Sequence, residues 1–205
     1  MAFLEPRIYL ASQSPRRREL LAQVGIRFDL LLFRGDSRCD PETNEDPLPN
    51  EAPEPYALRV AAAKARHGTH LLSLRRLPER PVLSADTTLD FEGQIIGKPS
   101  DDADAIAILT RLSGRTHRVL TAIAVAQRDR LETRLSVSEV RFRTLSADEI
   151  LRYVATGEPH DKAGAYALQG RAAMFVEQIS GSPSGIVGLP LCETALLLRE
   201  FGYPT

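Results

Sequence analysis

Two long runs of alternating apolar and polar residues lie next to each other in the second half of the chain, at Thr116–Gln127 and Leu131–Phe142. Only the polar triplet Arg128–Arg130 separates them. Alternation with a period of two indicates strands, and a short polar connection between two such runs indicates an antiparallel hairpin. Any fold of this chain therefore has to contain a long two-stranded ribbon.

Shorter strand and helix patterns alternate on both sides of this hairpin. Before it, the expected strands are Ile8–Ala11, Arg27–Phe33, Val82–Ala85, Thr87–Phe91 and Gln94–Ile96, and the expected helices are Pro15–Val24, Pro55–Leu72 and Asp101–Leu112. After it come a helix that opens on a capping box at Ser146–Glu149 and ends at Ala155, strand-like segments at Tyr166–Leu168 and Ala172–Ile179, and a last helix at Leu191–Phe201. This order predicts a mixed α/β sheet flanked by helices.

The size and composition of the chain narrow its class. With 205 residues, of which 43% are hydrophobic and 26% charged, we expect one domain or two tightly joined lobes with a core of their own. This composition excludes the disordered and fibrous classes. No stretch approaches the ~20 apolar residues of a membrane span, and the first residues lack the apolar run of a secretory signal. We therefore expect a cytoplasmic protein.

The charge balance, the cysteines and the histidines mainly argue against particular kinds of site. The 26 Lys and Arg residues and 27 Asp and Glu residues leave a net charge of −1, so a basic site would have to be local. Cys39 and Cys192 lie far apart without metal-ligand spacing, and we expect reduced thiols. His67 and His70 lack an HExxH pattern, which favours a solvated helix face over a zinc site.

The first candidate site is the turn that carries Ser12, Ser14, Arg16 and Arg17. A strand that leads into a helix beginning at Pro15 directs backbone N–H groups and the positive end of the helix toward an anion. Two hydroxyl and two guanidinium groups add donors suited to phosphate. The alternative is a capped helix with a solvated arginine run. No Walker-type GxxxxGK[ST] motif occurs, which excludes a P-loop NTPase.

The second candidate is Asp86 in the segment Ser84–Thr87, at the edge of an apolar strand. A carboxylate in that position among small residues is typical of a metal ligand or a catalytic group. A turn aspartate that binds its own backbone is the alternative. Lys98, held between a glycine and a proline, adds a cation in a defined loop.

The third candidate is the loop Gly157–Gly170, which combines glycines with Asp161 and Lys162. This mixture suits metal and phosphate contacts, and a polar surface loop is the alternative. Gln169 can read the edge of a base, because its amide both donates and accepts. The polar stretch Arg34–Pro53 is long for a compact domain, and loops of that length are often functional.

In combination these segments resemble the Maf family of nucleoside triphosphate pyrophosphatases. The matching motifs occur in family order along nearly the whole chain: LASQSPRRRELL (Leu10–Leu21), LRVAAAKA (Leu58–Ala65), SADTTL (Ser84–Leu89), GKP (Gly97–Pro99), LSGRTH (Leu112–His117), TGEPHDKAGAYALQG (Thr156–Gly170) and GIVGLPL (Gly185–Leu191). The DKAGAY…QG form resembles the branch that acts on dTTP and UTP, whereas the 7-methylguanosine triphosphate branch carries a different segment there.

The resemblance implies hydrolysis of dTTP and UTP to the monophosphate and pyrophosphate with a divalent cation, Mg²⁺ or Mn²⁺. It implies a single domain over residues 1–205, with an elongated mixed sheet and two lobes around a central cleft, similar to inosine triphosphate pyrophosphatases. Asp86 matches the family's proton acceptor, and Arg17, Thr87 and Gln169 match positions tied to base selectivity. The polar cleft residues are matched by Ser12, Arg16, Glu45, Lys64, Lys98, Asp161 and Lys162. The expected partner is a small nucleotide and neither nucleic acid nor membrane, with a homodimer left open.

These residues also fit the reaction on chemical grounds. Cleavage at the α-phosphorus of a strongly anionic triphosphate adds charge to the leaving pyrophosphate, so positioning and electrostatic stabilisation dominate. Positive charge can come from Arg16, Lys64, Lys98 and Lys162, and oxygen ligands for the cation from Glu45, Asp86 and Asp161. Asp86 can also deprotonate or orient the attacking water, and both roles stay open.

Two functions of other classes compete with this interpretation. One is a nucleotide-binding regulator without turnover, since the family has an association with septum formation. The intact set of Asp86, Lys98, Asp161 and Lys162 argues against it. The other is a nucleic-acid-binding module, which the net charge and the 6% aromatic content weaken.

Overall fold

The computed structural model describes residues 6–33 and 43–205. Its strands are β1 (Ile8–Leu10), β2 (Phe28–Leu30), β3 (Val82–Phe91), β4 (Gln94–Ile96), β5 (Thr116–Gln127), β6 (Arg130–Phe142) and β7 (Val176–Ser180). Within the described residues they form one seven-stranded sheet in the order β2-β1-β3-β5-β6-β7, with β4 beside β3. β1 runs parallel to β2 and β3, and the other pairs are antiparallel. The sheet is therefore mixed, as the sequence predicts.

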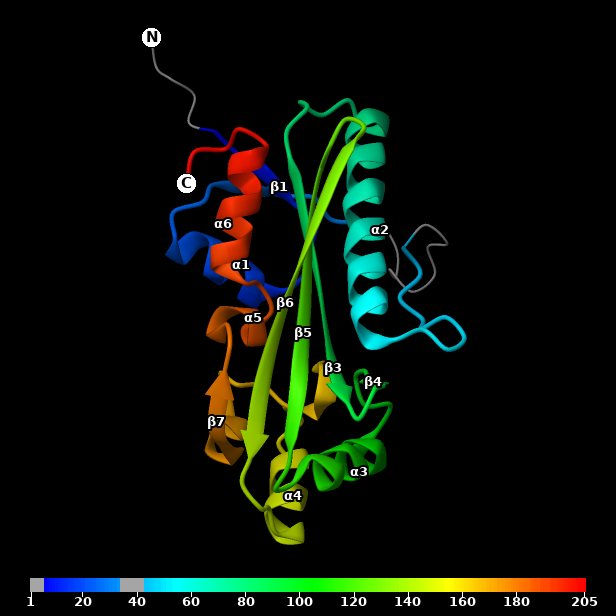
Figure 1. Ribbon diagram of the computed structural model, residues 1–205, viewed down its shortest axis with the longest axis vertical. Coiled ribbons are helices and arrows are strands. Elements are labelled where there is room, and N and C mark those ends of the chain that lie inside the picture. The colour runs from blue at the N-terminus through cyan, green and yellow to red at the C-terminus, as the bar shows by residue number, and fades with distance from the viewer. Residues whose placement is uncertain (1–5, 34–42) are drawn as a thin grey trace.

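Helices cover both faces of the sheet (Figure 1). The helices are α1 (Pro15–Gln23), α2 (Pro53–Leu74), α3 (Asp102–Leu112), α4 (Ala147–Val154), α5 (Pro183–Val187) and α6 (Leu191–Glu200), with 3₁₀ turns at Ala163–Ala165 and Arg171–Phe175. Figure 1 shows α2 on one side of the sheet, α1, α5 and α6 on the other, and α3 and α4 at the lower end. The predicted α/β architecture is confirmed.

The long hairpin is confirmed almost to the residue. β5 and β6 pair without interruption from Thr116 opposite Arg141 to Gln127 opposite Arg130. The tight turn between them places Arg128 at a positive φ of 54°. The hairpin runs along most of the length of the molecule, so both ends of the fold are built on it (Figure 1).

One difference from the sequence analysis bears directly on the site. The segments expected as two strands around Asp86 form the single strand β3, so Asp86 lies inside the strand and not at its edge. β1 pairs with β3 only at Val82 and Leu83, and β4 pairs only from Leu89 onward. In the described chain the residues between these two pairings have a strand neighbour, β5, on one side only. The central part of β3 therefore has an open edge.

The apolar core lies on both faces of the hairpin. On one face, alanines of α2 (Ala57, Ala61 and Ala65) pack on small residues of β5. On the other face, α1 and α6 cover the apolar residues of β1, β3 and β5, and α3 and α4 pack near the other ends of β3, β5 and β6. Small side chains let α2 lie close to the sheet, which brings the polar residues along its edge near β3.

Several local predictions are wrong at their ends or in type. Val24, the expected last residue of the first helix, lies beyond the end of α1 at Gln23 and is 48% exposed. Asp101, the expected first residue of the third helix, is the N-cap of α3 and accepts from the N–H of Asp104. The apolar segment Ala172–Phe175 is 3₁₀ helix and not strand. The other expected strand, Tyr166–Leu168, is irregular, and α5 was not expected.

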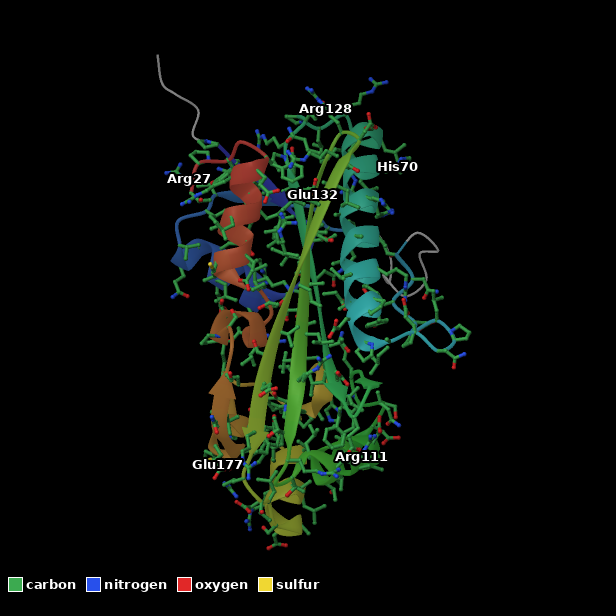
Figure 2. The ribbon with its side chains drawn as sticks, viewed as in Figure 1. Arg27, His70, Arg111, Arg128, Glu132 and Glu177 are labelled. Carbon is green, nitrogen blue, oxygen red and sulfur yellow. The ribbon has the colours of Figure 1, made fainter. Side chains whose placement is uncertain are left out.

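The surface of the described chain carries charges of both signs. Figure 2 shows Arg27, His70, Arg128 and Glu132 toward one end of the molecule and Arg111 and Glu177 toward the other. Cys192 is a free, exposed thiol, as expected, whereas Cys39 lies outside the described residues. Among the described helices, none has the length and apolar character to cross a membrane.

Candidate active site

A cavity of about 600 Å³ lies beside the open edge of β3. All twelve residues singled out from the sequence line it: Ser12, Ser14, Arg16, Arg17, Glu45, Lys64, Asp86, Thr87, Lys98, Asp161, Lys162 and Gln169. They come from α1, α2, β3 and four loops that are far apart in the chain. The fold therefore brings the three sequence clusters together into one site.

Asp86 and Thr87 face opposite sides of the sheet, because consecutive strand residues alternate. Asp86 accepts a hydrogen bond from Lys64 of α2, and Thr87 accepts one from Arg17 of α1. The cavity wraps around the edge of β3 and reaches both sides. It therefore has two polar centres, which we call the carboxylate cluster (Glu45, Lys64 and Asp86) and the hydroxyl cluster (Ser12 and Thr87 around Arg17).

In the carboxylate cluster a single ammonium group joins two acids. Lys64 Nζ lies 2.9 Å from Glu45 Oε1 and 2.9 Å from Asp86 Oδ1. The exposed fractions of the three side chains are 12% for Lys64, 24% for Glu45 and 12% for Asp86, so the cluster is largely shielded from solvent. Charge-assisted hydrogen bonds of this length hold the two carboxylates turned toward the same point.

Glu45 is held in place by two residues of α2 that the sequence analysis missed. The hydroxyl of Tyr56 donates to the carbonyl oxygen of Glu45 at 2.8 Å. Arg59 donates to the carbonyl oxygens of Asn44 at 2.9 Å and Asp46 at 3.0 Å. Burial raises the pKa of Tyr56, so its hydroxyl stays protonated and available as a donor. Three consecutive carbonyl groups are thus held against α2. In the sequence, the one signal that Tyr56 and Arg59 support the site is their position about one to two helical turns before Lys64.

In the hydroxyl cluster, Arg17 joins three segments of the chain. Its Nε donates to the Gly188 carbonyl at 2.8 Å, Nη1 to Ser12 Oγ at 3.2 Å, and Nη2 to Thr87 Oγ1 at 3.2 Å. Burial lowers the pKa of the Arg17 guanidinium, and the nearby carboxylates of Asp86 and Glu45 oppose that shift. The hydroxyl of Ser14 does not cap α1, although its N–H donates to Ser12 Oγ at 3.2 Å.

The loop that carries Asp161, Lys162 and Gln169 forms a further part of the cavity wall. Its Gly164 N–H donates to the Gly97 carbonyl at 2.9 Å, next to Lys98. Gly164 has a positive φ of 72°, and an added Cβ would lie 2.1 Å from a methyl group of Leu89, so only glycine fits here. The docked loop therefore brings its two charged residues beside the Lys98 loop.

The three acids do not form one cluster. Asp161 is paired with Lys162, and its side chain is 72% exposed. Within the described residues, no three His, Cys, Asp or Glu side chains lie close enough to hold a metal ion together. Glu45 and Asp86 alone converge, and two carboxylates completed by substrate phosphates are a usual site for Mg²⁺. These oxygen donors fit a hard divalent cation.

His117 lies on β5, behind the cavity wall. Its Nε2 lies 2.8 Å from the hydroxyl of Tyr166, which lines the cavity. Burial lowers the pKa of His117 to about 4. The imidazole is therefore neutral near pH 7 and belongs to the core that supports the loop.

Comparisons with known proteins show which family this chain resembles. A family model described as "Maf-like protein" matches residues 7–201. A protein of Aromatoleum aromaticum named dTTP/UTP pyrophosphatase is 61% identical over 202 residues, which are 98% of this chain and 98% of the relative. A protein of Dechloromonas aromatica with the same name is 59% identical over 96% of this chain and 98% of its own.

Among solved structures, the Ham1 protein of Staphylococcus aureus aligns with a TM-score of 0.45 at 14% sequence identity. The alignment covers 82% of this chain and 90% of the Ham1 chain.

Proposed function

This chain belongs to the Maf family, and we propose that it hydrolyses dTTP and UTP to the corresponding monophosphate and pyrophosphate. The observation that carries the proposal is the carboxylate cluster at the open edge of β3, in a cavity that is also lined by Arg16 of α1 and by the loop residues Lys98 and Lys162. The near full-length identity to proteins named dTTP/UTP pyrophosphatase supports the same conclusion.

In this proposal Asp86 is the general base for the attacking water. Its carboxylate faces the cavity and is oriented by Lys64, which fixes the direction of its lone pairs. Asp86 accepts a proton from water as the water oxygen bonds to the α-phosphorus. The bond from the α-phosphorus to the bridging oxygen breaks, and the electron pair leaves with pyrophosphate. Atoms balance, since one water is consumed and one nucleoside monophosphate and one pyrophosphate form.

The cations of the cavity would hold the triphosphate. Arg16, Lys98 and Lys162 line the same cavity as Asp86. Each can donate to phosphate oxygens, and Arg16 at the start of α1 adds to the positive end of the helix. Charge that develops on the leaving pyrophosphate is then stabilised by groups that are already in position.

A divalent cation is part of the proposal. Glu45 and Asp86 would hold Mg²⁺ or Mn²⁺ together with phosphate oxygens, and the cation would neutralise phosphate charge when bound. Lys64 bridges the same two oxygens, so it would have to turn away from at least one carboxylate. Asp161, which the family resemblance adds to the metal ligands, does not join Glu45 and Asp86 in one group in this part of the described chain.

The proposal includes two broader statements. Residues 1–205 would form one domain with two lobes around the cavity, supported by an uninterrupted family match over residues 7–201. The protein would act in the cytoplasm, where its nucleotide substrates are made and used.

Asp86→Asn tests the assignment of the site. The substitution keeps the shape of the side chain and removes its basicity, so we expect pyrophosphate release to fall by ~10²–10⁴-fold with nucleotide binding largely retained. Pyrophosphate release from UTP and calorimetric binding of UTP are measured on the same preparation. Near-normal turnover would reject Asp86 as the proton acceptor.

A further inference from the structure

Thr87 is the most exposed residue of β3, and it lines the cavity. Its hydroxyl oxygen receives a hydrogen bond from Arg17 Nη2 at 3.2 Å. On the other side it lies 3.0 Å from the hydroxyl oxygen of Thr121, its cross-strand partner on β5. Thr121 is 1% exposed, lies behind the cavity wall, and is 2.8 Å from the carbonyl oxygen of Gly185.

Counting protons fixes the direction of every bond in this chain. The Gly185 carbonyl can only accept, so Thr121 gives its single hydroxyl proton to Gly185. Thr121 must then accept in its bond with Thr87, and Thr87 gives its own single proton to Thr121. Arg17 can only donate, which occupies one lone pair of Thr87. Thr87 therefore has no proton left and one lone pair free for a ligand.

Ser12 has the opposite polarity, and the same guanidinium sets it. Its oxygen accepts from Arg17 Nη1 and from the N–H of Ser14, both at 3.2 Å. These two bonds occupy both lone pairs of the hydroxyl and leave its proton free to donate. Arg17 thus holds one hydroxyl as a donor and another as an acceptor on the cavity wall.

We propose that the network Thr121–Gly185 fixes Thr87 as a hydrogen-bond acceptor for N3–H of thymine and uracil, and that Thr121 is a positioning residue for pyrimidine selectivity. Uracil and thymine carry a proton on N3, between two carbonyl groups. Cytosine has a bare lone pair on N3, which would face the lone pair of Thr87. A site that presents a fixed acceptor rejects the base that lacks the donor, because a buried polar group is left unpaired.

This inference rests on the proposed function and adds to it the group that sets the choice. A free threonine hydroxyl would rotate and serve either base, so Thr87 alone carries no selectivity between UTP and CTP. The discrimination comes from Thr121, which does not line the cavity. The fixed polarity of Thr87 would act beside Gln169, whose amide can present both a donor and an acceptor.

Thr121→Val tests the inference, because valine keeps the shape of threonine and cannot accept the proton of Thr87. The freed hydroxyl can then rotate and donate to N3 of cytosine. We expect kcat/KM for CTP to rise by about fivefold or more while kcat/KM for UTP changes little, so that the UTP/CTP ratio falls. A purely structural defect would lower both values together. Thr121→Ser restores the acceptor and should restore the ratio of the unaltered protein.

Two further variants keep the test decisive. Thr87→Val removes the acceptor itself and should also lower the UTP/CTP ratio, even if Thr121→Val fails to fold. Thr88→Val is the matched control, because the neighbouring Thr88 hydroxyl is buried and has no hydrogen-bond partner within the described chain. It should leave the ratio unchanged.

The outcomes separate this inference from the proposed function. If the unaltered protein hydrolyses UTP and the ratio is the same in Thr121→Val and Thr87→Val, the inference is overturned and the function stands. If the unaltered protein releases no pyrophosphate, the function fails. In that case the inference is tested by binding. The dissociation constants for UTP and CTP are measured by calorimetry on the same four variants, and the preference for UTP over CTP should fall in Thr121→Val and Thr87→Val.

Discussion

Lys64 occupies the space between the two carboxylates that would hold a divalent cation, and this makes a prediction about metal affinity. Its ammonium is 2.9 Å from Glu45 Oε1 and 2.9 Å from Asp86 Oδ1. A cation that binds between these oxygens has to break at least one of the two bonds. Lys64 therefore competes with the metal when no nucleotide is present, and Lys64→Met should bind Mn²⁺ more tightly than the unaltered protein.

The size of the effect follows from the bonds that are lost. A hydrogen bond to a charged group contributes ~1.5–3 kcal/mol, and the partial exposure of Glu45 favours the lower part of that range. Mn²⁺ has to break one such bond in the unaltered protein and none in Lys64→Met. The dissociation constants of the two proteins for Mn²⁺ should therefore differ by roughly 10-fold to 150-fold. Without metal, the variant leaves two carboxylates unpaired and should unfold at a lower temperature.

Titration calorimetry with Mn²⁺ in the absence of nucleotide measures this difference directly. Lys64→Arg is the control, since it keeps the positive charge and should keep the weak affinity of the unaltered protein. Lys98→Met removes a cation from the same cavity whose side chain is exposed, and it should not strengthen Mn²⁺ binding. Equal or weaker Mn²⁺ binding by Lys64→Met would refute the competition, whatever happens to the rate of hydrolysis.

Two further predictions concern the supports of the site. Tyr56→Phe removes one hydrogen bond to the Glu45 carbonyl and should weaken Mn²⁺ binding by about 2-fold to 10-fold, since a neutral hydrogen bond contributes ~0.5–1.5 kcal/mol; unchanged affinity would mean that Tyr56 does not hold Glu45. Burial lowers the pKa of His117 from 6.5 to about 4. Between these two pH values the imidazole is protonated in the unfolded chain and neutral in the folded chain. The free energy of unfolding should therefore be greatest above pH 6.5 and fall toward pH 4 by up to about 3 kcal/mol, and urea denaturation should show a shallower fall in His117→Phe. An equally steep fall in that variant would assign the pH dependence to other groups.

Features with a local cause could be predicted from the sequence. The hairpin follows from alternation over two adjacent runs, and the capping box at Ser146 and Glu149 forms with both of its hydrogen bonds. The convergence of twelve distant residues on one cavity could be expected only through the family resemblance. The spacing of these residues along the chain does not predict that they converge.

Features that depend on several segments at once could not be predicted. The pattern marked Asp86 as the edge of a strand, but its exposure to the cavity comes from the lengths of β1 and β4, which leave the centre of β3 open. Apolar residues at Ala172–Phe175 suggested a strand, yet they fill the core from a 3₁₀ turn. The hydrogen bonds of Tyr56, Arg59 and Thr121 join segments whose pairing is visible only in the folded chain.

We propose that this site cleaves pyrimidine triphosphates between the α- and β-phosphates. The most direct test measures products and rates for dTTP, UTP, CTP, dATP, GTP and 7-methyl-GTP with the unaltered protein and Mg²⁺ or Mn²⁺. We expect equal amounts of nucleoside monophosphate and pyrophosphate, with the highest kcat/KM for dTTP and UTP. Release of orthophosphate and a nucleoside diphosphate, a preference for 7-methyl-GTP, or tight nucleotide binding without any turnover would contradict it.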